Sequence, residues 1–230
     1  INAKKSRNHT ELLLKYLKYP IKIKKNKKFD LIEVKGLRQF KSFDYKVPGD
    51  ISSASFFIVL TLLSKNSTLL IKNININQSR IGILKILNKM NANIKIINKR
   101  NYKGEHIGDI KIKSTKIFKS INCPEKLNSS AIDEFLLIFL IASKSKGIST
   151  FKNLNELNKK ESPRLDMAIK FLRMIGIKVI RKNYDIKIYG NPKLKLKNKY
   201  QMKNFLKDHR VFMMTVVAAL TLGGKWKIND

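Results

Sequence analysis

The sequence predicts an α/β fold in which one structural unit repeats three times. Three stretches share a plan of apolar helix, polar turn and β-rich run: residues 52–74, 129–154 and 208–230. Between them, residues 80–97 and 163–182 each combine an amphipathic helix with an Ile/Val-rich strand. Further strands follow at "DIKIKST" and "DIKIYG". The predicted unit is therefore helix–strand–helix–strand–strand, with a period of about 80 residues.

The first 46 residues differ from these repeats. They contain one helical stretch, "HTELLLKYL", and two strand-like stretches, "IKIKK" and "LIEVKG", as the end of a preceding, similar unit would. We therefore expect two domains, with residues 1–46 ending the first and residues 47–230 forming the second, whose last unit is cut short. The sequence does not begin with Met and ends abruptly at "GGKWKIND", so we expect a fragment of a longer protein.

Composition indicates a globular protein. Hydrophobic residues make up 43% of the 230 positions, and no apolar run reaches the roughly 20 residues that a membrane span requires. The single cysteine, Cys123, excludes an internal disulfide and a cysteine-based metal site, and we expect it to act as a small apolar residue. The three histidines lie far apart. We expect no metal, no cofactor and a cytoplasmic location.

The formal net charge of +33 is extreme and has two explanations. One is a polyanionic partner, above all a nucleic acid. The other is a compositional bias towards Lys, Asn and Ile, whose codons are AT-rich. We favour the bias, because the lysines are spread along the chain and no basic stripe with interleaved aromatic residues is present.

Each helix that opens a repeat begins with polar residues suited to capping. These residues are Asp50, Ser52 and Ser53 in the first unit, Ser129 and Ser130 in the second, and Asp208 in the third. If the units pack around a common axis, the three helix N-termini meet on one side. Helix N-termini carry partial positive charge, so such a meeting point favours anions.

The stretch "NKKESPRLD", residues 158–166, predicts a helix start with Ser162 as N-cap and Pro163 at the first helical position. Lys160 and Arg164 crowd the same end, where the helix dipole disfavours cations. Our hypothesis is that their partner lies outside the protein and is an anionic substrate.

Several stretches, taken in order, carry a family resemblance over nearly the whole chain. They are "SRNHTELLLKYL" (6–17), "VPGDISSASFF" (47–57), "NQSRIGILKILNKMNANI" (77–94), "AIDEF" (131–135), "NKKESPRL" (158–165) and "DHRVFM" (208–213). In these the chain resembles the 5-enolpyruvylshikimate-3-phosphate synthases, although that family usually has Asp where Pro163 stands. The resemblance implies the enolpyruvyl transferase fold, an inside-out α/β barrel of repeated βαβαββ units.

The same resemblance implies an activity. It is transfer of the enolpyruvyl group of phosphoenolpyruvate to the 5-hydroxyl of shikimate 3-phosphate, with release of phosphate, in the shikimate pathway of aromatic amino-acid biosynthesis. We expect a monomer whose 230 residues are inactive alone. Two alternatives stay open: the related transferase that acts on UDP-N-acetylglucosamine and, in a different class, a basic nucleic-acid-binding module.

The resemblance also implies two catalytic carboxyl groups. Asp133, expected in the first turn of its helix, would accept the proton of the 5-hydroxyl, and Glu134 would be a solvated or supporting neighbour. Glu161 would donate or shuttle a proton near the enol carbon. The residues alone allow plainer roles: Asp133 suits a helix start, and Glu161 could pair with Arg164 at i, i+3. Arg80 is expected to be structural or interdomain.

Five further residues are implied to bind the substrates. Lys160 and Arg164 would contact hydroxyl, carboxylate or phosphate groups. Arg210 would bind phosphoenolpyruvate with the help of His209, and Ser6 would contact substrate from the first domain. Without the resemblance, a histidine at a helix start is more often a cap or a surface residue.

Overall fold

The N-terminal body is a three-stranded antiparallel sheet with one helix. In this computed structural model, residues 1–4, 6–27, 29–36, 39 and 41–229 are described. The body contains β1 (Asn2–Lys4), α1 (His9–Tyr16), β2 (Ile21–Lys25) and β3 (Phe29–Val34), and its strand order is β1-β3-β2. The predicted helix and two strands are confirmed. Strand β1 was missed, because its sequence, Asn-Ala-Lys, has no apolar alternation.

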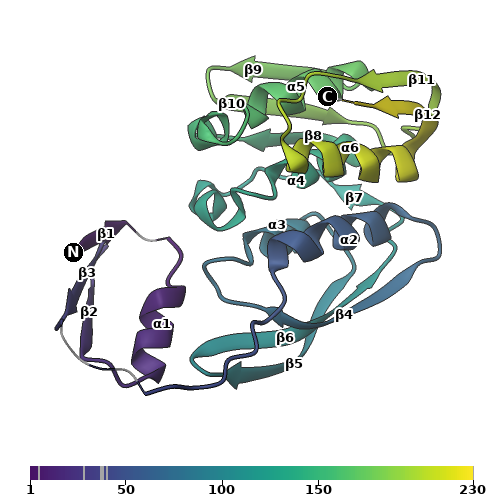
Figure 1. The fold of residues 1–230 in the computed structure, drawn as a ribbon. Helices are drawn as coiled ribbons and strands as arrows, with labels where there is room; N and C mark the ends of the chain where they lie inside the picture. Colours follow the sequence, from purple (N-terminus) through teal and green to yellow (C-terminus); the bar gives the residue numbers. More distant parts are fainter. Residues whose placement is uncertain (5, 28, 37–38, 40, 230) are drawn as a thin grey trace.

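The second body contains the predicted repeats (Figure 1). The first unit has α2 (Ile51–Leu63), β4 (Thr68–Asn75), α3 (Gly82–Lys89), β5 (Ile94–Tyr102) and β6 (Glu105–Lys113). The second has β7 (Phe118–Lys119), the short 3-10 turns η1 (Glu125–Leu127) and η2 (Ser129–Ala131), α4 (Phe135–Ser143), β8 (Ser145–Phe151), η3 (Asn155–Lys159), α5 (Arg164–Met174), β9 (Val179–Lys182) and β10 (Asp185–Gly190). The third has β11 (Leu196–Met202), α6 (His209–Leu222) and β12 (Gly223–Ile228).

The sheets reveal an opening strand that the predicted unit lacked. In the second unit β7 pairs in parallel with β8, and the sheet order is β7-β8-β10-β9. The first unit has the matching order β4-β6-β5, and Gly49 forms a parallel bridge to Ile74 beside β4. In the third unit β11 pairs in parallel with β12. The complete unit is therefore βαβαββ, as the family resemblance implies, and the helix-first unit was one strand short.

The core lies between the sheets. Helices α2, α4 and α6 pack on one another inside the second body, and the strands form its outer layers (Figure 1). Every residue of α4 is buried, and Phe135 and Phe139 pack edge-on against Phe151 of β8. This apolar run is therefore the central core helix. Within the described residues, no helix has both the length and the apolar character needed to cross a membrane.

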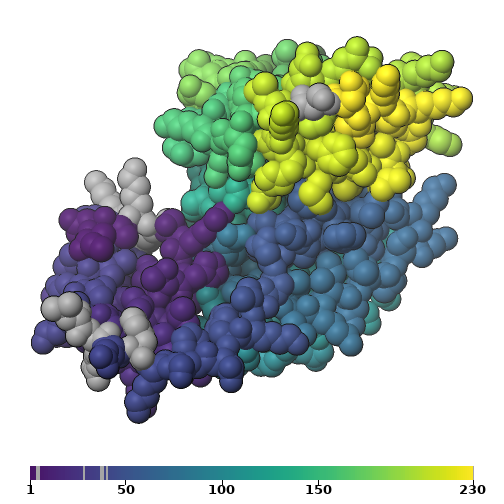
Figure 2. Space-filling model, in the orientation of Figure 1, coloured from purple at the N-terminus to yellow at the C-terminus, as the bar shows by residue number. Residues whose placement is uncertain are grey.

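In the sequence, residues 35–50 lie between β3 and α2, and the domain boundary expected near Val47 stays a prediction. Gly49 already belongs to the second body through its bridge to Ile74. Helix α1 contacts β6 of the first unit. In the space-filling view the purple N-terminal body lies against the blue and teal first unit, and the surface is recessed between it and the green part above (Figure 2).

Candidate active site

The starts of the three inner helices meet, as predicted. Asp50 caps α2 and Asp208 caps α6, and each carboxylate accepts a hydrogen bond from a main-chain amide of its helix. Ser52 of α2 donates a hydrogen bond to Glu134 at the start of α4. Arg164, the first residue of α5, contacts both Asp208 and the loop before α4. Side chains from four helix starts therefore form one connected cluster.

Arg164 is the centre of this cluster, and its side chain is only 1% exposed. Its Nε lies 2.9 Å from Asp208 Oδ2, its Nη1 lies 3.4 Å from Asp133 Oδ1, and its Nη2 pairs with Glu161. Lys160 Nζ lies 3.3 Å from the same oxygen of Asp133. The hypothesis that Lys160 and Arg164 lack a partner within the protein is therefore wrong. Carboxylates brought in by the fold offset the unfavourable helix dipole.

Asp133 is surrounded by cations from four parts of the chain. It lies in the turn between η2 and α4, so the expectation of a place in the first helical turn is wrong: α4 begins two residues later, at Phe135. Its side chain is 12% exposed and also pairs with Arg7 of the N-terminal body. Arg210 Nη1 donates to the main-chain oxygen of Asp133 over 3.2 Å. Asp133 therefore joins the two bodies and two units of the repeat.

The pKa values of Asp133 and Asp208, the two aspartates that contact Arg164, are lowered. Burial alone would raise the pKa of Asp133, but the charges of Arg210, Lys160 and Arg7 outweigh it and hold the pKa below the ordinary 3.8. Burial would likewise raise the pKa of Asp208, but hydrogen bonds from Arg164 and Ser162 outweigh it. Both groups therefore remain carboxylates at neutral pH.

These lowered values predict loss of stability in acid. A carboxyl group whose pKa is lower in the folded than in the unfolded chain stabilises the fold fully above the unfolded value. That stabilisation is lost as the pH falls through the folded value. For Asp133 and Asp208 the loss should begin near pH 3.8 and continue below it. Urea unfolding at a series of pH values measures the effect.

The control for this prediction is Asp208→Asn, which removes one of the two titrating groups. We expect this variant to be less stable at neutral pH but to lose less of its remaining stability in acid. An acid-induced loss of equal size in both proteins would show that Asp208 does not carry the effect.

Glu134 differs sharply from its neighbour Asp133. Its residue surface is only 3% exposed, so the expectation of a solvated side chain is wrong, while a supporting role remains open. Burial raises the pKa of Glu134 above the ordinary 4.5, and the hydrogen bond from Ser52 offsets this only in part. Two adjacent carboxyl groups thus have pKa values shifted in opposite directions.

The other predicted residues lie at or outside the rim of the cluster. Glu161 forms the i, i+3 pair with Arg164 that the sequence allowed, with its side chain 57% exposed. His209 and Ser6 are exposed, and within the described residues their side chains do not join the cluster. Arg7, next to Ser6, was missed by the sequence analysis. Its position beside a predicted contact residue was the only signal for it.

The start of α5 also departs from the sequence prediction. Ser162 does not cap this helix, because its hydroxyl donates to the carboxylate that caps α6, over 2.8 Å. The side chain of Asn158 takes the capping role and accepts from the amide of Leu165 over 2.9 Å. Pro163 occupies the N-cap position and Arg164 begins the helix. The polar groups of Ser162 and Arg164 are thereby directed inward, to the cluster.

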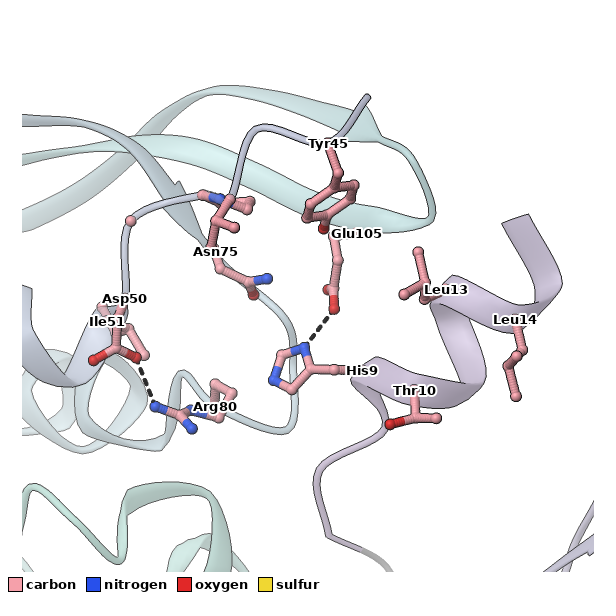
Figure 3. A pocket seen from close by; sticks show the side chains of 13 residues that line it. His9, Thr10, Leu13, Leu14, Tyr45, Asp50, Ile51, Asn75, Arg80 and Glu105 are labelled. Carbon is pink, nitrogen blue, oxygen red and sulfur yellow. Dashed lines mark hydrogen bonds and ion pairs between the residues drawn. The ribbon is translucent and has the colours of Figure 1, made fainter. Parts of the chain in front are cut away.

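A cavity of about 410 Å³ lies beside the cluster, between α1 and the second body. Figure 3 shows two polar pairs on its walls: His9 of α1 with Glu105, and Arg80 with Asp50. The distance from Arg80 Nη2 to Asp50 Oδ1 is 2.8 Å, which agrees with the structural role expected for Arg80. The other walls of the cavity are mainly apolar and come from Leu13, Leu14, Val47, Pro48 and Ile51.

Comparison with known proteins identifies the family. The family described as EPSP synthase (3-phosphoshikimate 1-carboxyvinyltransferase) matches over residues 1–230. The chain belongs to the EPSP synthase family. A protein of Petrotoga mobilis named 3-phosphoshikimate 1-carboxyvinyltransferase is 38% identical over 231 residues, which are all of this chain and 52% of that protein. A Clostridium tetani protein of the same name is 35% identical over 98% of this chain and 49% of its own length.

Solved structures agree with this family. EPSP synthase from Acinetobacter baumannii superposes with a TM-score of 0.86 at 30% identity, over 97% of this chain and 50% of that one. The enolpyruvyl transferase NikO from Streptomyces tendae superposes with a TM-score of 0.65 at 14% identity, over 94% of this chain and 47% of that one, a likeness of fold alone. The predicted enolpyruvyl transferase fold is confirmed. The chain spans about half the length of the curated relatives it matches.

In this member of the EPSP synthase family, the cluster has a clear chemical capacity. Asp133 is an ionised carboxylate able to accept a hydrogen bond or a proton. Lys160 is 28% exposed and Arg7 is more exposed still, so both cations can also reach a ligand at the surface of the cluster. Arg164 is enclosed and holds the carboxylates in place. The site therefore combines a potential base with accessible positive charge.

Proposed function

We propose that this chain contributes to an enzyme that transfers the enolpyruvyl group of phosphoenolpyruvate to the 5-hydroxyl of shikimate 3-phosphate. The observation that carries the proposal is the carboxylate of Asp133, which lies among Arg7, Lys160, Arg164 and Arg210 where the helix starts meet. Both substrates are polyanions with phosphate and carboxylate groups, which such cations complement. The names of the relatives support the same activity.

In the proposed reaction, the carboxylate of Asp133 takes the proton of the 5-hydroxyl. The hydroxyl oxygen at the same time forms a bond to C2 of phosphoenolpyruvate. Glu161 supplies a proton to the methylene carbon C3, which becomes a methyl group in the tetrahedral intermediate. The ionised Glu161 then takes back one of those methyl protons, and the bond from C2 to the phosphate oxygen breaks. The phosphate leaves with the proton that Asp133 took from the hydroxyl. The exposed position of Glu161 at the rim suits a group that exchanges protons.

The substrate-binding roles are also proposals. Lys160 and Arg210 are the cations best placed to bind substrate. Lys160 is partly exposed, and the guanidinium of Arg210 donates to a main-chain oxygen, that of Asp133, and not to a carboxylate of the described residues. Ser6 and His209 are exposed and free of the cluster, so they would contact substrate only in a closed complex. Arg164, being buried, would bind substrate through rearrangement of its carboxylate partners.

We further propose that residues 47–230 belong to one domain and residues 1–46 to another, with the substrates bound between them. The contact of Arg7 with Asp133 supports this arrangement, since it brings a cation of the N-terminal body to the proposed base.

The experiment is an assay of the complete gene product. The protein is incubated with phosphoenolpyruvate and either shikimate 3-phosphate or UDP-N-acetylglucosamine. Phosphate release is measured, and the organic product is identified by mass spectrometry. We expect phosphate and the enolpyruvyl ether only with shikimate 3-phosphate. Phosphate release only with the sugar nucleotide, or with neither acceptor, would overturn the proposal.

A further inference from the structure

A series of hydrogen bonds connects the start of α4 to the start of α2 and to Arg80, just before α3. Glu134 Oε1 accepts a hydrogen bond from the hydroxyl of Ser52, in the first turn of α2. The same hydroxyl oxygen accepts from Arg80 Nη2 over 2.8 Å, and that nitrogen also donates to Asp50. A serine hydroxyl has one proton and two lone pairs, so it can take part in both bonds at once.

The side chain of Glu134 does not cap its own helix, α4. It occupies the N-cap position of α4, but its side chain makes no capping hydrogen bond. A buried carboxyl group is expensive unless it is hydrogen-bonded, and an apolar side chain of similar size would stabilise this position better. Helix capping and packing therefore do not explain why a carboxyl group is buried beside Asp133.

The residue most affected by these hydrogen bonds is Asp133. It lies in a turn outside the regular helix, so the hydrogen-bond pattern of α4 does not hold its main chain. Arg7 of the N-terminal body and Lys160 both form ion pairs with its carboxylate. On the other side, Glu134 anchors the adjacent peptide to α2 through Ser52. A base misplaced by about 1 Å can lose about 100-fold in rate, so such an anchor matters.

We propose that Glu134, held by Ser52, is a positioning residue that fixes the direction in which the Asp133 carboxylate points. This inference rests on the proposed function. Arg80 extends this series of hydrogen bonds to the wall of the cavity beside α1, and thereby connects that cavity to the proposed base.

The experiment compares four variants of the complete gene product. Glu134→Ala and Ser52→Ala each remove the anchor, and Glu134→Gln keeps an oxygen that can accept from Ser52. Ser67→Ala is the matched control, because Ser67 lies in the turn after α2 and its hydroxyl donates to the main-chain oxygen of Lys65. We expect the first two to lower kcat by about 10- to 100-fold with little change in the KM for phosphoenolpyruvate. Glu134→Gln should restore kcat to within about 3-fold of wild type, and Ser67→Ala should match wild type.

The two anchor variants should also be non-additive, because they remove the same interaction. The double variant Ser52→Ala/Glu134→Ala is therefore expected to be no slower than the worse single variant. Wild-type kcat in Glu134→Ala, or an equal loss in Glu134→Gln and Glu134→Ala, would overturn the inference. So would a loss confined to thermal stability.

Failure of the proposed function is distinguishable from failure of this inference. If the wild-type protein transfers no enolpyruvyl group, ¹³C NMR titration of the Asp133 carboxyl group decides the matter. We expect its titration to shift in Glu134→Ala and to stay closer to wild type in Glu134→Gln. An Asp133 titration unchanged in Glu134→Ala would overturn the positioning role.

Discussion

Replacing Asp133 by asparagine is expected to lower kcat of the complete gene product by about 100- to 10,000-fold, the usual contribution of general acid–base catalysis. Asparagine has nearly the same shape and can still accept a hydrogen bond from Lys160 or Arg7. It cannot take up the proton of the 5-hydroxyl. Initial rates of phosphate release at saturating phosphoenolpyruvate and shikimate 3-phosphate measure the effect.

The matched control is Asp166→Asn, on the exposed side of α5, where the native carboxylate pairs, among the described residues, with Arg181 alone. This change removes one negative charge from the same body without touching the cluster, and we expect kcat within about 2-fold of wild type, in line with the small worth of a surface ion pair. If Asp133→Asn retained a third or more of the wild-type kcat, Asp133 would not be the base.

The second large effect is on stability. Arg164→Ala should lower the free energy of unfolding by about 3–5 kcal/mol, the usual result of removing one partner from a buried ion pair. The change leaves the buried carboxylate of Asp208 without its guanidinium and takes one cation from Asp133. Urea unfolding at pH 7, followed by circular dichroism and by tryptophan fluorescence, measures this loss.

Two comparisons isolate the buried pair. Arg181→Ala breaks a surface ion pair and should cost no more than about 1 kcal/mol. The double variant Arg164→Met/Asp208→Asn should be more stable than the sum of its single variants predicts, since neither partner is then left charged and alone. A cost for Arg164→Ala no larger than that of Arg181→Ala would mean that the pair contributes little to the fold.

The strength of the sequence signal decided which elements were predicted. The amphipathic helices and Ile/Val strands of the repeats have clear periodicity, and they were found. The opening strands were missed for two reasons. Strand β7 has only two residues, and β11, "LKNKYQM", buries only its ends, Leu196 and Met202, so neither has the alternation that marks a strand.

The cluster was predicted in part. Local sequence identifies the cations at the start of α5, but it does not identify the carboxylates that pair with them. Cations at the start of α5 were correctly singled out as unfavourable for the helix. Their partners are distant in the sequence: Asp208, in the third unit, is 44 residues from Arg164, and Asp133, in the same unit as Arg164, is 31 residues away. Local rules detect such a misplaced charge, but only the folded arrangement of the repeats supplies the carboxylates that offset it.

The central position of α4 has a consequence for folding. In linear repeat arrays each unit contacts only its neighbours, so units can fold and unfold almost independently. Here α4 packs against helices of all three units, including α2, α3, α5 and α6. Loss of the first or the third unit would expose this wholly buried and mainly apolar helix to water. We therefore expect the three units to unfold together rather than one at a time.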